Sequence, residues 1–274
     1  MKIIDCKELK NKQIPGIKQY VKNNGSCSLA IVQVLGDSAS DTYTKNKVKL
    51  GTELGLKVEH FTFKEDIEDC ILQYELENIC KFYDGVILQL PLPKHLQKYE
   101  QQLLDTIPFD KDVDCLSTHS IGLLHSGKAK YFPCTAKAVL DVLDEYQYDL
   151  DGKNVLIVGR QQLLGYPLFR MMTDRNATCT LAHSHTKNLE KMLSSGKYDV
   201  VVSAIGKPKF LNNIKTDFIL DVGINRDENG KLCGDINLDT CKFEYATTVG
   251  GGVGGLGQLT VLNLCKNTII AGGR

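Results

Sequence analysis

The sequence has 274 residues, enough for two compact domains, which is the more common arrangement at this length. Its 33 basic and 33 acidic residues balance, so its charge gives no indication of a nucleic-acid or membrane-surface binder. No apolar run approaches the roughly 20 residues of a membrane span, and the first residues contain no apolar signal segment. We therefore expect a cytoplasmic protein with neither nucleic-acid nor membrane partners.

The ten cysteines are scattered without a CxxC pair, and the six histidines share no metal-ligand spacing with them. Only His183 and His185 lie close together, and such a pair is weak evidence for a metal. We expect reduced thiols and no bound metal.

The first half of the chain alternates apolar strand patterns with helical patterns, which is typical of βαβ units and a parallel sheet. Gly36 and Asp37 supply a turn and a cap before the first of these helices, and Gly55 ends it. The expected strands are residues 28–35, 58–63 and 86–90, and the expected helices are residues 39–54, 67–82 and 96–104.

The helix expected at residues 39–54 carries one stripe made of Tyr43, Lys47, Leu50 and Leu54. This stripe is apolar apart from the lysine amine. Burial disfavours the charged form of an amine, which would make Lys47 a usable proton acceptor. The alternative is that the side chain lies at the edge of the stripe and keeps its amine in water, which is the more common fate of a lone lysine.

The third strand ends at Gln89, where Pro91 and Pro93 stop it. Ligands of open α/β sheets bind at the carboxyl ends of strands, so Gln89 is a candidate site residue. The loop at residues 110–114 has three carboxylates in five residues, and by itself this pattern indicates a solvated turn.

A new helix is expected after Pro133, with Thr135 as a candidate N-cap, and we place the change of domain there. Strand and helix patterns then restart and predict a doubly wound unit of about 100 residues. The expected strands are residues 155–158, 178–182, 200–204 and 218–222, and the expected helices are residues 168–174, 189–193 and 259–270.

The turn after residue 158 contains Gly159 and Gly165, and glycines there let a backbone approach a pyrophosphate at a helix N-terminus. Their spacing is not G-x-G-x-x-G, so an ordinary turn explains it nearly as well. About 20 residues on, an NAD enzyme carries an acidic residue, whereas residues 183–186 offer only imidazole and hydroxyl groups. These groups, with Arg160, suit a 2′-phosphate and favour NADP.

Glycine is also concentrated near the end of the chain, where six of the ten residues at 248–257 are glycine. Such a run indicates a mobile linker, a hinge or a backbone that approaches a ligand.

Together these stretches resemble the bifunctional methylenetetrahydrofolate dehydrogenase/methenyltetrahydrofolate cyclohydrolase family, over nearly the whole chain and in the order of that family. The resemblance is carried by Ala39-Ser40 with Tyr43 and Lys47, QLPLP at 89–93, KDVD at 111–114, PCT at 133–135, Gly159-Arg160 with Gly165 and Pro167, His183-Ser184 with Thr186, DVGIN at 221–225, Gly234-Asp235 and GGVG at 251–254. Any one stretch could arise by chance, but the ordered set is specific.

The resemblance implies an α/β fold of two domains that flank a cleft: an N-terminal three-layer α/β domain and a C-terminal Rossmann-like NADP-binding domain. We expect residues 1–134, with the C-terminal helix at 258–274, to form the folate-binding catalytic domain. Residues 135–257 then form the NADP-binding domain, and the resemblance implies a homodimer joined through it.

Roles for individual residues are implied in the same way. Lys47 would handle protons, Tyr43 would stack on the folate, and Gln89 would orient the lysine. The expected substrate contacts are Tyr43, Gln89, Leu90, Pro91 and Asp114, of which Asp114 would hydrogen-bond the pterin. The expected cofactor contacts are Gly159, Arg160, Gln161, Gly165, Ser184 and Ile224.

The implied activity is oxidation of methylenetetrahydrofolate to methenyltetrahydrofolate with NADP, followed by hydrolysis to formyltetrahydrofolate, in one-carbon metabolism. One alternative is a shikimate-type NADP-dependent dehydrogenase, which the QLPLP and KDVD stretches argue against. Another is a non-catalytic ligand-binding descendant of the fold.

Three departures from the family pattern bear on these expectations. Gln161 replaces a serine, which puts cofactor affinity and preference in doubt. Cys115 replaces a glycine after KDVD, which allows the pterin loop a different backbone path. Thr248 and Gly250 replace prolines and residues 255–257 look inserted, so we expect residues 248–257 to be more mobile than usual in the family.

Overall fold

The computed structural model describes residues 1–273; Arg274 and the side chains of Ser38 and Ala39 lie outside the described part, so the alanine of the resemblance stays untested. The chain folds into two compact units, each assembled from two segments. The three-stranded unit comprises Gln13–Cys134 and Val261–Arg274, and the six-stranded unit comprises Met1–Lys12 and Thr135–Thr260.

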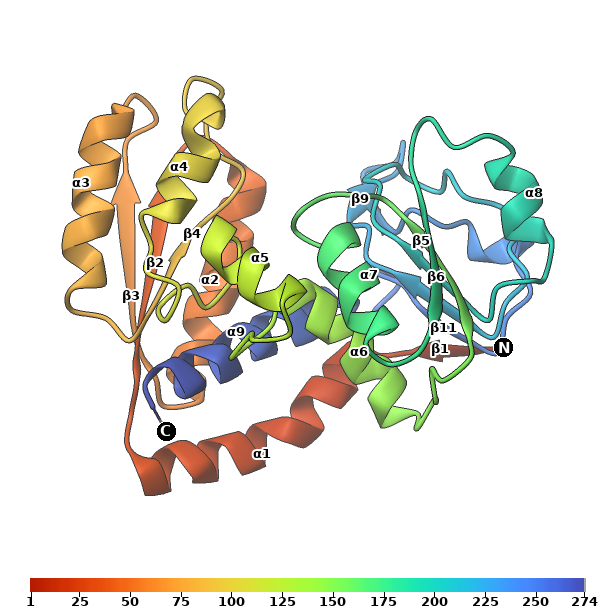
Figure 1. The fold of residues 1–274 in the computed structure, drawn as a ribbon, viewed down its shortest axis with the longest axis horizontal. Coiled ribbons are helices and arrows are strands. Elements are labelled where there is room, and N and C mark those ends of the chain that lie inside the picture. Colours follow the sequence, from red (N-terminus) through yellow and green to blue (C-terminus); the bar gives the residue numbers. More distant parts are fainter. Residues whose placement is uncertain (274) are drawn as a thin grey trace. The chain divides into compact units, whose positions relative to one another are not determined.

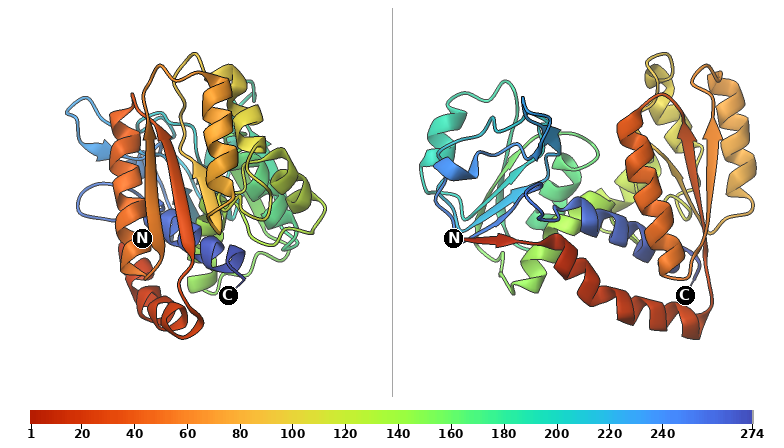
Figure 2. Two further views of the ribbon diagram at one scale, coloured as in Figure 1. Left: turned by 90° about the vertical axis from the view of Figure 1, so that its left-hand side faces the viewer. Right: turned by 180° about the vertical axis from the view of Figure 1, so that it is seen from behind.

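The three-stranded unit contains a parallel sheet with the strand order β3-β2-β4. Helices α2 and α3 lie on opposite faces of this sheet (Figures 1 and 2). Every strand and helix predicted for this half is present, with ends that differ by a few residues. The elements are β2 (Ser28–Val34), α2 (Ser38–Glu53), β3 (Lys57–Phe63), α3 (Asp69–Cys80), β4 (Gly85–Leu88), η1 (Gln97–Tyr99), α4 (Glu100–Asp105) and α5 (Thr118–His125).

The side chains of β2 explain these layers. Ala30 and Val32 are fully buried in one core with Leu76 of α3, whereas Ile31 lies in a second core with Val48 of α2. Successive side chains of a strand point to opposite faces, so a central strand buried on both sides is apolar throughout. This is why the sequence shows a continuous apolar run at β2.

The six-stranded unit contains a sheet with the order β1-β11-β8-β7-β5-β6, in which all neighbouring strands are parallel. From β5 the chain passes to β6 on one side and then to β7 on the other, so the strand order reverses beside β5. Ligands of doubly wound sheets bind at such a point. The strands are β1 (Lys2–Ile4), β5 (Asn154–Val158), β6 (Thr178–Ala182), β7 (Val200–Ser203), β8 (Phe218–Asp221) and β11 (Tyr245–Thr247).

The remaining elements belong to the six-stranded unit or contain residues of both units. β9 and β10 pair with each other in a separate antiparallel ribbon. Helices α1 and α9 each contribute residues to both units. These elements are α1 (Cys6–Asn24), α6 (Cys134–Glu145), α7 (Gly165–Thr173), α8 (Leu189–Ser194), β9 (Asn225–Arg226), β10 (Leu232–Cys233), η2 (Leu238–Thr240) and α9 (Gly257–Ala271).

Two of the positions expected from the sequence are different in the structure. Residues 1–12 belong to the six-stranded unit, because β1 pairs in parallel with β11, Lys2 opposite Tyr245. Thr135 is not an N-cap, because α6 already begins at Cys134 and Thr135 lies within its first turn.

The glycine-rich segment at residues 248–257 forms a turn that is anchored by hydrogen bonds. The Gly254 N–H donates to Asp5 Oδ1 at 3.0 Å, and the Gly254 carbonyl accepts from the Cys6 N–H at 2.9 Å. Gly250 has a φ of 101°, and a Cβ there would lie 2.2 Å from the Leu232 carbonyl oxygen. Glycine is therefore required at residue 250 by both conformation and space, while the enhanced mobility of the segment stays a prediction.

Thr44 on α2 is fully buried, and its hydroxyl has no hydrogen-bond partner among the described residues. A buried hydroxyl without a partner costs about 1–3 kcal/mol of stability. We expect Thr44→Val, which keeps the side-chain shape and removes the hydroxyl, to raise the melting temperature by about 2–4 °C. Thermal unfolding followed by circular dichroism measures this, with the exposed Thr52→Val on the same helix as the control. Equal shifts for the two variants would contradict the explanation.

Within residues 1–273, no helix is long and apolar enough to cross a membrane. The same residues contain no disulfide bond and no cluster of three metal-ligating side chains.

Candidate active site

The Lys47 amine is buried in the three-stranded unit. Lys47 is 5% exposed, and its Nζ donates a hydrogen bond to Gln89 Oε1 at 2.9 Å. Nζ also lies 5.1 Å from the centroid of the Tyr43 ring, within the range of a cation–π contact. The alternative in which the amine stays in water is therefore wrong. Leu90, half-buried, and Pro91, exposed, directly follow the glutamine.

The Gln89 amide is held in one orientation. Its Nε2 donates to the Leu90 carbonyl at 2.6 Å, so Oε1 is the atom that faces Lys47. Ser40 Oγ lies 3.3 Å from the same carbonyl and 2.7 Å from Asp37 Oδ2. Asp37 is the N-cap of α2 and accepts from the Ser40 N–H. These bonds connect the start of α2 to the end of β4, which fixes the amine against the amide.

Asp114 lies in the same neighbourhood as Lys47. Burial raises the pKa of the Cys134 thiol well above its ordinary value; the Asp114 charge raises it further, and the Lys47 charge lowers it. Both charges therefore act on one buried sulfur atom. Asp114 itself is half-buried, so its carboxylate is accessible to a ligand. The structure thus brings Tyr43, Lys47 and Gln89 into contact, and Asp114 lies near the same buried sulfur atom as Lys47.

The loop that carries Asp114 is held by Asp112, a residue whose role the sequence did not reveal. The Asp112 carboxylate is 2% exposed and accepts from the backbone N–H groups of Leu116 at 3.3 Å and Ser117 at 2.8 Å. Cys115, which lies between Asp112 and these two N–H donors in the sequence, has a φ of 59°. This is the left-handed region that glycine enters at low cost. An L-residue in this conformation costs roughly 1–2 kcal/mol, so the substitution of cysteine for glycine is accommodated with strain.

In the six-stranded unit, the glycine turn after β5 is packed against backbone. Gly159 has a φ of 128°, and a Cβ there would lie 2.6 Å from the Ala204 carbonyl oxygen. A Cβ on Gly165 would lie 2.2 Å from the Gly159 carbonyl oxygen. Gln161 Nε2 donates to the Ala204 carbonyl at 2.6 Å. The glutamine that replaces serine therefore ties this turn to the loop after β7.

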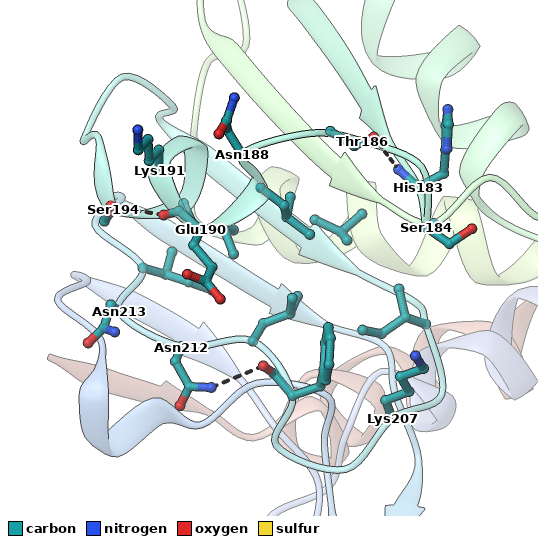
Figure 3. A pocket seen from close by; sticks show the side chains of 18 of the residues that line it. His183, Ser184, Thr186, Asn188, Glu190, Lys191, Ser194, Lys207, Asn212 and Asn213 are labelled. Atoms are coloured by element: carbon teal, nitrogen blue, oxygen red, sulfur yellow. Dashed lines mark hydrogen bonds between the residues drawn. The ribbon is translucent and has the colours of Figure 1, made fainter.

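A pocket of about 1510 Å³ opens at the carboxyl ends of β5, β6 and β7 (Figure 3). Of the predicted cofactor residues, Gly159, Arg160, Gln161 and Ser184 line it. Gly165 is instead buried beneath the turn, and Ile224, 57% exposed after β8, is not among the lining residues.

The loop after β6 is closed by its own side chains. The His183 N–H donates to Thr186 Oγ1 at 2.8 Å (Figure 3). The His185 N–H donates to His183 Nδ1 at 3.2 Å. Ser184 is exposed at the tip of this loop. The turn thus presents a hydroxyl and imidazole groups, and no carboxylate, at the position where a ribose 2′-substituent is read.

The pocket has the chemistry of a dinucleotide site that accepts an extra phosphate. Gly159 lines the pocket, and a residue without a side chain leaves its backbone open to a pyrophosphate. The lining contains five cationic side chains, Arg160 and Lys207 among them, and one carboxylate, Glu190. Lys207 was not predicted from the sequence; its place in the loop after β7, at the carboxyl edge of the sheet, was the available signal.

Gly165→Ala is expected to disrupt this turn. Overpacking of this kind costs about 1–3 kcal/mol, and the melting temperature should fall by about 2–10 °C. Differential scanning calorimetry measures the change. Gly122→Ala on α5 is the control, because a Cβ on Gly122 would have no heavy atom within 4 Å and alanine favours a helix. A Gly165→Ala protein as stable as the Gly122→Ala protein would refute the packing argument.

Two family models match the chain, one over each half of the sequence. Residues 4–114 match the catalytic domain of tetrahydrofolate dehydrogenase/cyclohydrolase, and residues 133–273 match its NAD(P)-binding domain. The chain belongs to the tetrahydrofolate dehydrogenase/cyclohydrolase family. Membership confirms the predicted family, the α/β fold and the enzyme class, and it removes the support for a shikimate-type dehydrogenase.

Several members of the tetrahydrofolate dehydrogenase/cyclohydrolase family are similar over nearly their full length. The bifunctional protein FolD of Agathobacter rectalis is 37% identical over 271 residues, which are 96% of this chain and 91% of that protein. The crystal structure of the FolD enzyme of Campylobacter jejuni has a TM-score of 0.91 at 32% identity and covers 100% of this chain and 99% of its own. The Trypanosoma brucei enzyme, complexed with NADP cofactor and an inhibitor, has a TM-score of 0.88 at 26% identity, covering 100% and 97%.

Proposed function

We propose that this chain oxidises methylenetetrahydrofolate to methenyltetrahydrofolate with NADP, and then hydrolyses methenyltetrahydrofolate to formyltetrahydrofolate. The observation that carries the proposal is the buried hydrogen bond between Lys47 Nζ and Gln89 Oε1, in the part of the chain that matches the catalytic domain. The similar Trypanosoma brucei enzyme, whose structure contains NADP, supports the choice of oxidant.

The three-stranded unit would supply the folate side of the reaction. Tyr43 offers an aromatic face on which a pterin stacks, and the Asp114 carboxylate can accept two N–H donors of the pterin together. Leu90 and Pro91 would form an apolar border beside Gln89. In the oxidation step these groups only bind and orient the substrate, because NADP supplies the hydride acceptor.

The six-stranded unit would hold the cofactor. The turn at Gly159 and Gly165 would receive the pyrophosphate, and Arg160 with Ser184 would contact the 2′-phosphate. Gln161 connects this turn to the loop after β7 through its hydrogen bond to the Ala204 carbonyl. Ile224, an exposed apolar side chain after β8, would pack against the nicotinamide ring.

In the hydrolysis step Lys47 would move protons. A water oxygen bonds to the methenyl carbon while one ring C–N bond breaks; one water proton passes to the released nitrogen, and the other leaves to solvent. Lys47 Nζ would relay the proton from the attacking water to the released nitrogen. Gln89 Oε1 accepts an N–H of this amine and would keep it oriented during the reaction.

The wider organisation follows from the same proposal. The folate-binding domain would comprise residues 13–134 and the residues of α9 from 261 onward. The NADP-binding domain would comprise residues 1–12 and 135–260. We also propose a homodimer in the cytoplasm, on the basis of the family resemblance.

Two absorbance assays test the function. NADPH formation with methylenetetrahydrofolate measures the dehydrogenase, and loss of methenyltetrahydrofolate absorbance without cofactor measures the cyclohydrolase. We expect both activities in the same preparation. Absence of both activities would favour the non-catalytic alternative, and NADP reduction with shikimate would favour the other dehydrogenase.

A further inference from the structure

Two carboxylates in the six-stranded unit are buried and have no part in the function proposed above. Asp221 ends β8 and is 2% exposed, and Asp235 follows β10 and is fully buried. Burying a carboxylate is costly unless donors surround it. The donors around these two groups therefore indicate what they stabilise.

Asp235 accepts hydrogen bonds from both loops that follow the central strands. From the end of β7 and its loop, Oδ2 accepts from Ser203 Oγ at 2.9 Å and the Ile205 N–H at 2.7 Å, and Oδ1 accepts from the Lys207 N–H at 3.0 Å. From the start of β9, which follows the loop after β8, Oδ1 accepts from Asn225 Nδ2 at 2.8 Å. One side chain thus joins the two loops.

Asp221 in turn holds the backbone of Asp235. Its Oδ1 accepts from the Asp235 N–H at 3.0 Å and the Gly223 N–H at 3.1 Å, and its Oδ2 accepts from the Ile236 N–H at 2.9 Å. The pKa of Asp221 is raised to about 7, chiefly by burial and also by the Asp235 charge, against the N–H donors, which lower it. Measurements at about pH 8 therefore keep most Asp221 ionised.

Glycines let the two carboxylates approach this closely. A Cβ on Gly223 would lie 2.2 Å from Asp235 Oδ1, and a Cβ on Gly234 would lie 2.0 Å from Asp221 Oδ2. The Asp235 carboxylate thus occupies the space that a side chain at residue 223 would need. The Asp221 carboxylate occupies the space that a side chain at residue 234 would need. The stretches DVGIN and Gly234-Asp235 are therefore packed against each other, and each needs the glycine of the other.

The loops joined in this way carry groups of the cofactor site. Ile205 and Lys207 line the pocket, and Ile224 lies directly between Gly223 and Asn225. We propose that Asp235 is a positioning residue for NADP: it fixes the loops after β7 and β8 so that the pocket is preformed for the cofactor. This inference rests on the proposed function, because it takes NADP as the ligand. A preformed site avoids the entropy cost of ordering loops on binding.

The test is Asp235→Asn, with NADP binding measured by isothermal titration calorimetry. Asparagine keeps the volume but loses one of the two accepting oxygens, so two of the four donors lose their acceptor. We expect the dissociation constant of NADP, and the KM for NADP, to rise at least tenfold. Cyclohydrolase activity without cofactor should stay within twofold, because Lys47 and Gln89 belong to the other unit.

Asp239→Asn is the matched control, because Asp239 is exposed on η2 in the same unit. Unchanged NADP affinity in Asp235→Asn, or an equal loss of both activities, would overturn the inference. If Asp235→Asn does not fold, Asn225→Ala tests the proposal, since it removes only one half-buried donor to Asp235. We expect Asn225→Ala to bind NADP about threefold more weakly. An unchanged NADP affinity in Asn225→Ala would contradict the proposal. A wild-type protein that neither binds nor reduces NADP would instead contradict the proposed function itself.

Discussion

Lys47→Met is expected to lower the rate of methenyltetrahydrofolate hydrolysis by about 10²–10⁴-fold, the usual contribution of a positioned proton-transfer group. Methionine fills nearly the same space as the buried lysine stem but can neither accept nor donate the proton. Folate binding should persist, because Tyr43 and Asp114 keep their positions. The decrease in methenyltetrahydrofolate absorbance measures the rate, and equilibrium binding of a folate measures the affinity.

Lys45→Met is the control, since Lys45 lies on the same helix with its side chain exposed. It removes the same charge two residues away and should leave hydrolysis within twofold. Undiminished hydrolysis in Lys47→Met would remove the proposed role of this lysine. Loss of folate binding together with hydrolysis would instead indicate that the buried amine maintains the site's structure.

Ser184→Asp is expected to reverse the preference between the two nicotinamide cofactors. The wild-type enzyme should have a kcat/KM for NADP at least tenfold above that for NAD, because residues 183–186 offer no carboxylate to a ribose hydroxyl. An aspartate about 5 Å from a 2′-phosphate would repel it by about 3 kcal/mol at an effective dielectric constant of about 20. The kcat/KM for NADP should therefore fall about 100-fold, and the kcat/KM for NAD should fall by less than threefold.

Initial rates of methylenetetrahydrofolate oxidation with each cofactor provide this measurement. Ser195→Asp is the control, because Ser195 is also exposed in the six-stranded unit but does not line the pocket. A wild-type preference for NAD would overturn our interpretation of residues 183–186. Equal losses in the two aspartate variants would mean that the new charge acts at long range and not on a bound 2′-phosphate.

Sequence patterns predicted the parts of this fold that depend on local chemistry. The apolar run of β2, the Asp37 cap and the Gly55 stop define one helix and its neighbours, and each lies within a few residues of its signal. The stripe on α2 correctly placed Lys47 beside Leu50 and Leu54, all of which are buried. What the stripe left open was the fate of the amine, which depends on Gln89, 42 residues away.

The features that were missed depend on contacts between distant residues. β1 has three residues, too few for a pattern, and is a strand only because β11 pairs with it. α1 contains an internal Pro15 and many polar residues, which hide its helical period. Asp235 looks like any turn carboxylate, since the donors that give it a role come from residues 203–207 and 225.

The pairing of β1 with β11 has a practical consequence for dividing the two activities between separate polypeptides. A fragment of residues 135–260 alone would leave β11 as an uncovered edge strand, whose unpaired N–H and C=O groups invite aggregation. A fragment of residues 13–134 would lack Leu264, which α9 contributes to its core. Cutting the chain after residue 134 would thus damage both halves, and single substitutions that silence one activity are the sounder route to studying the other.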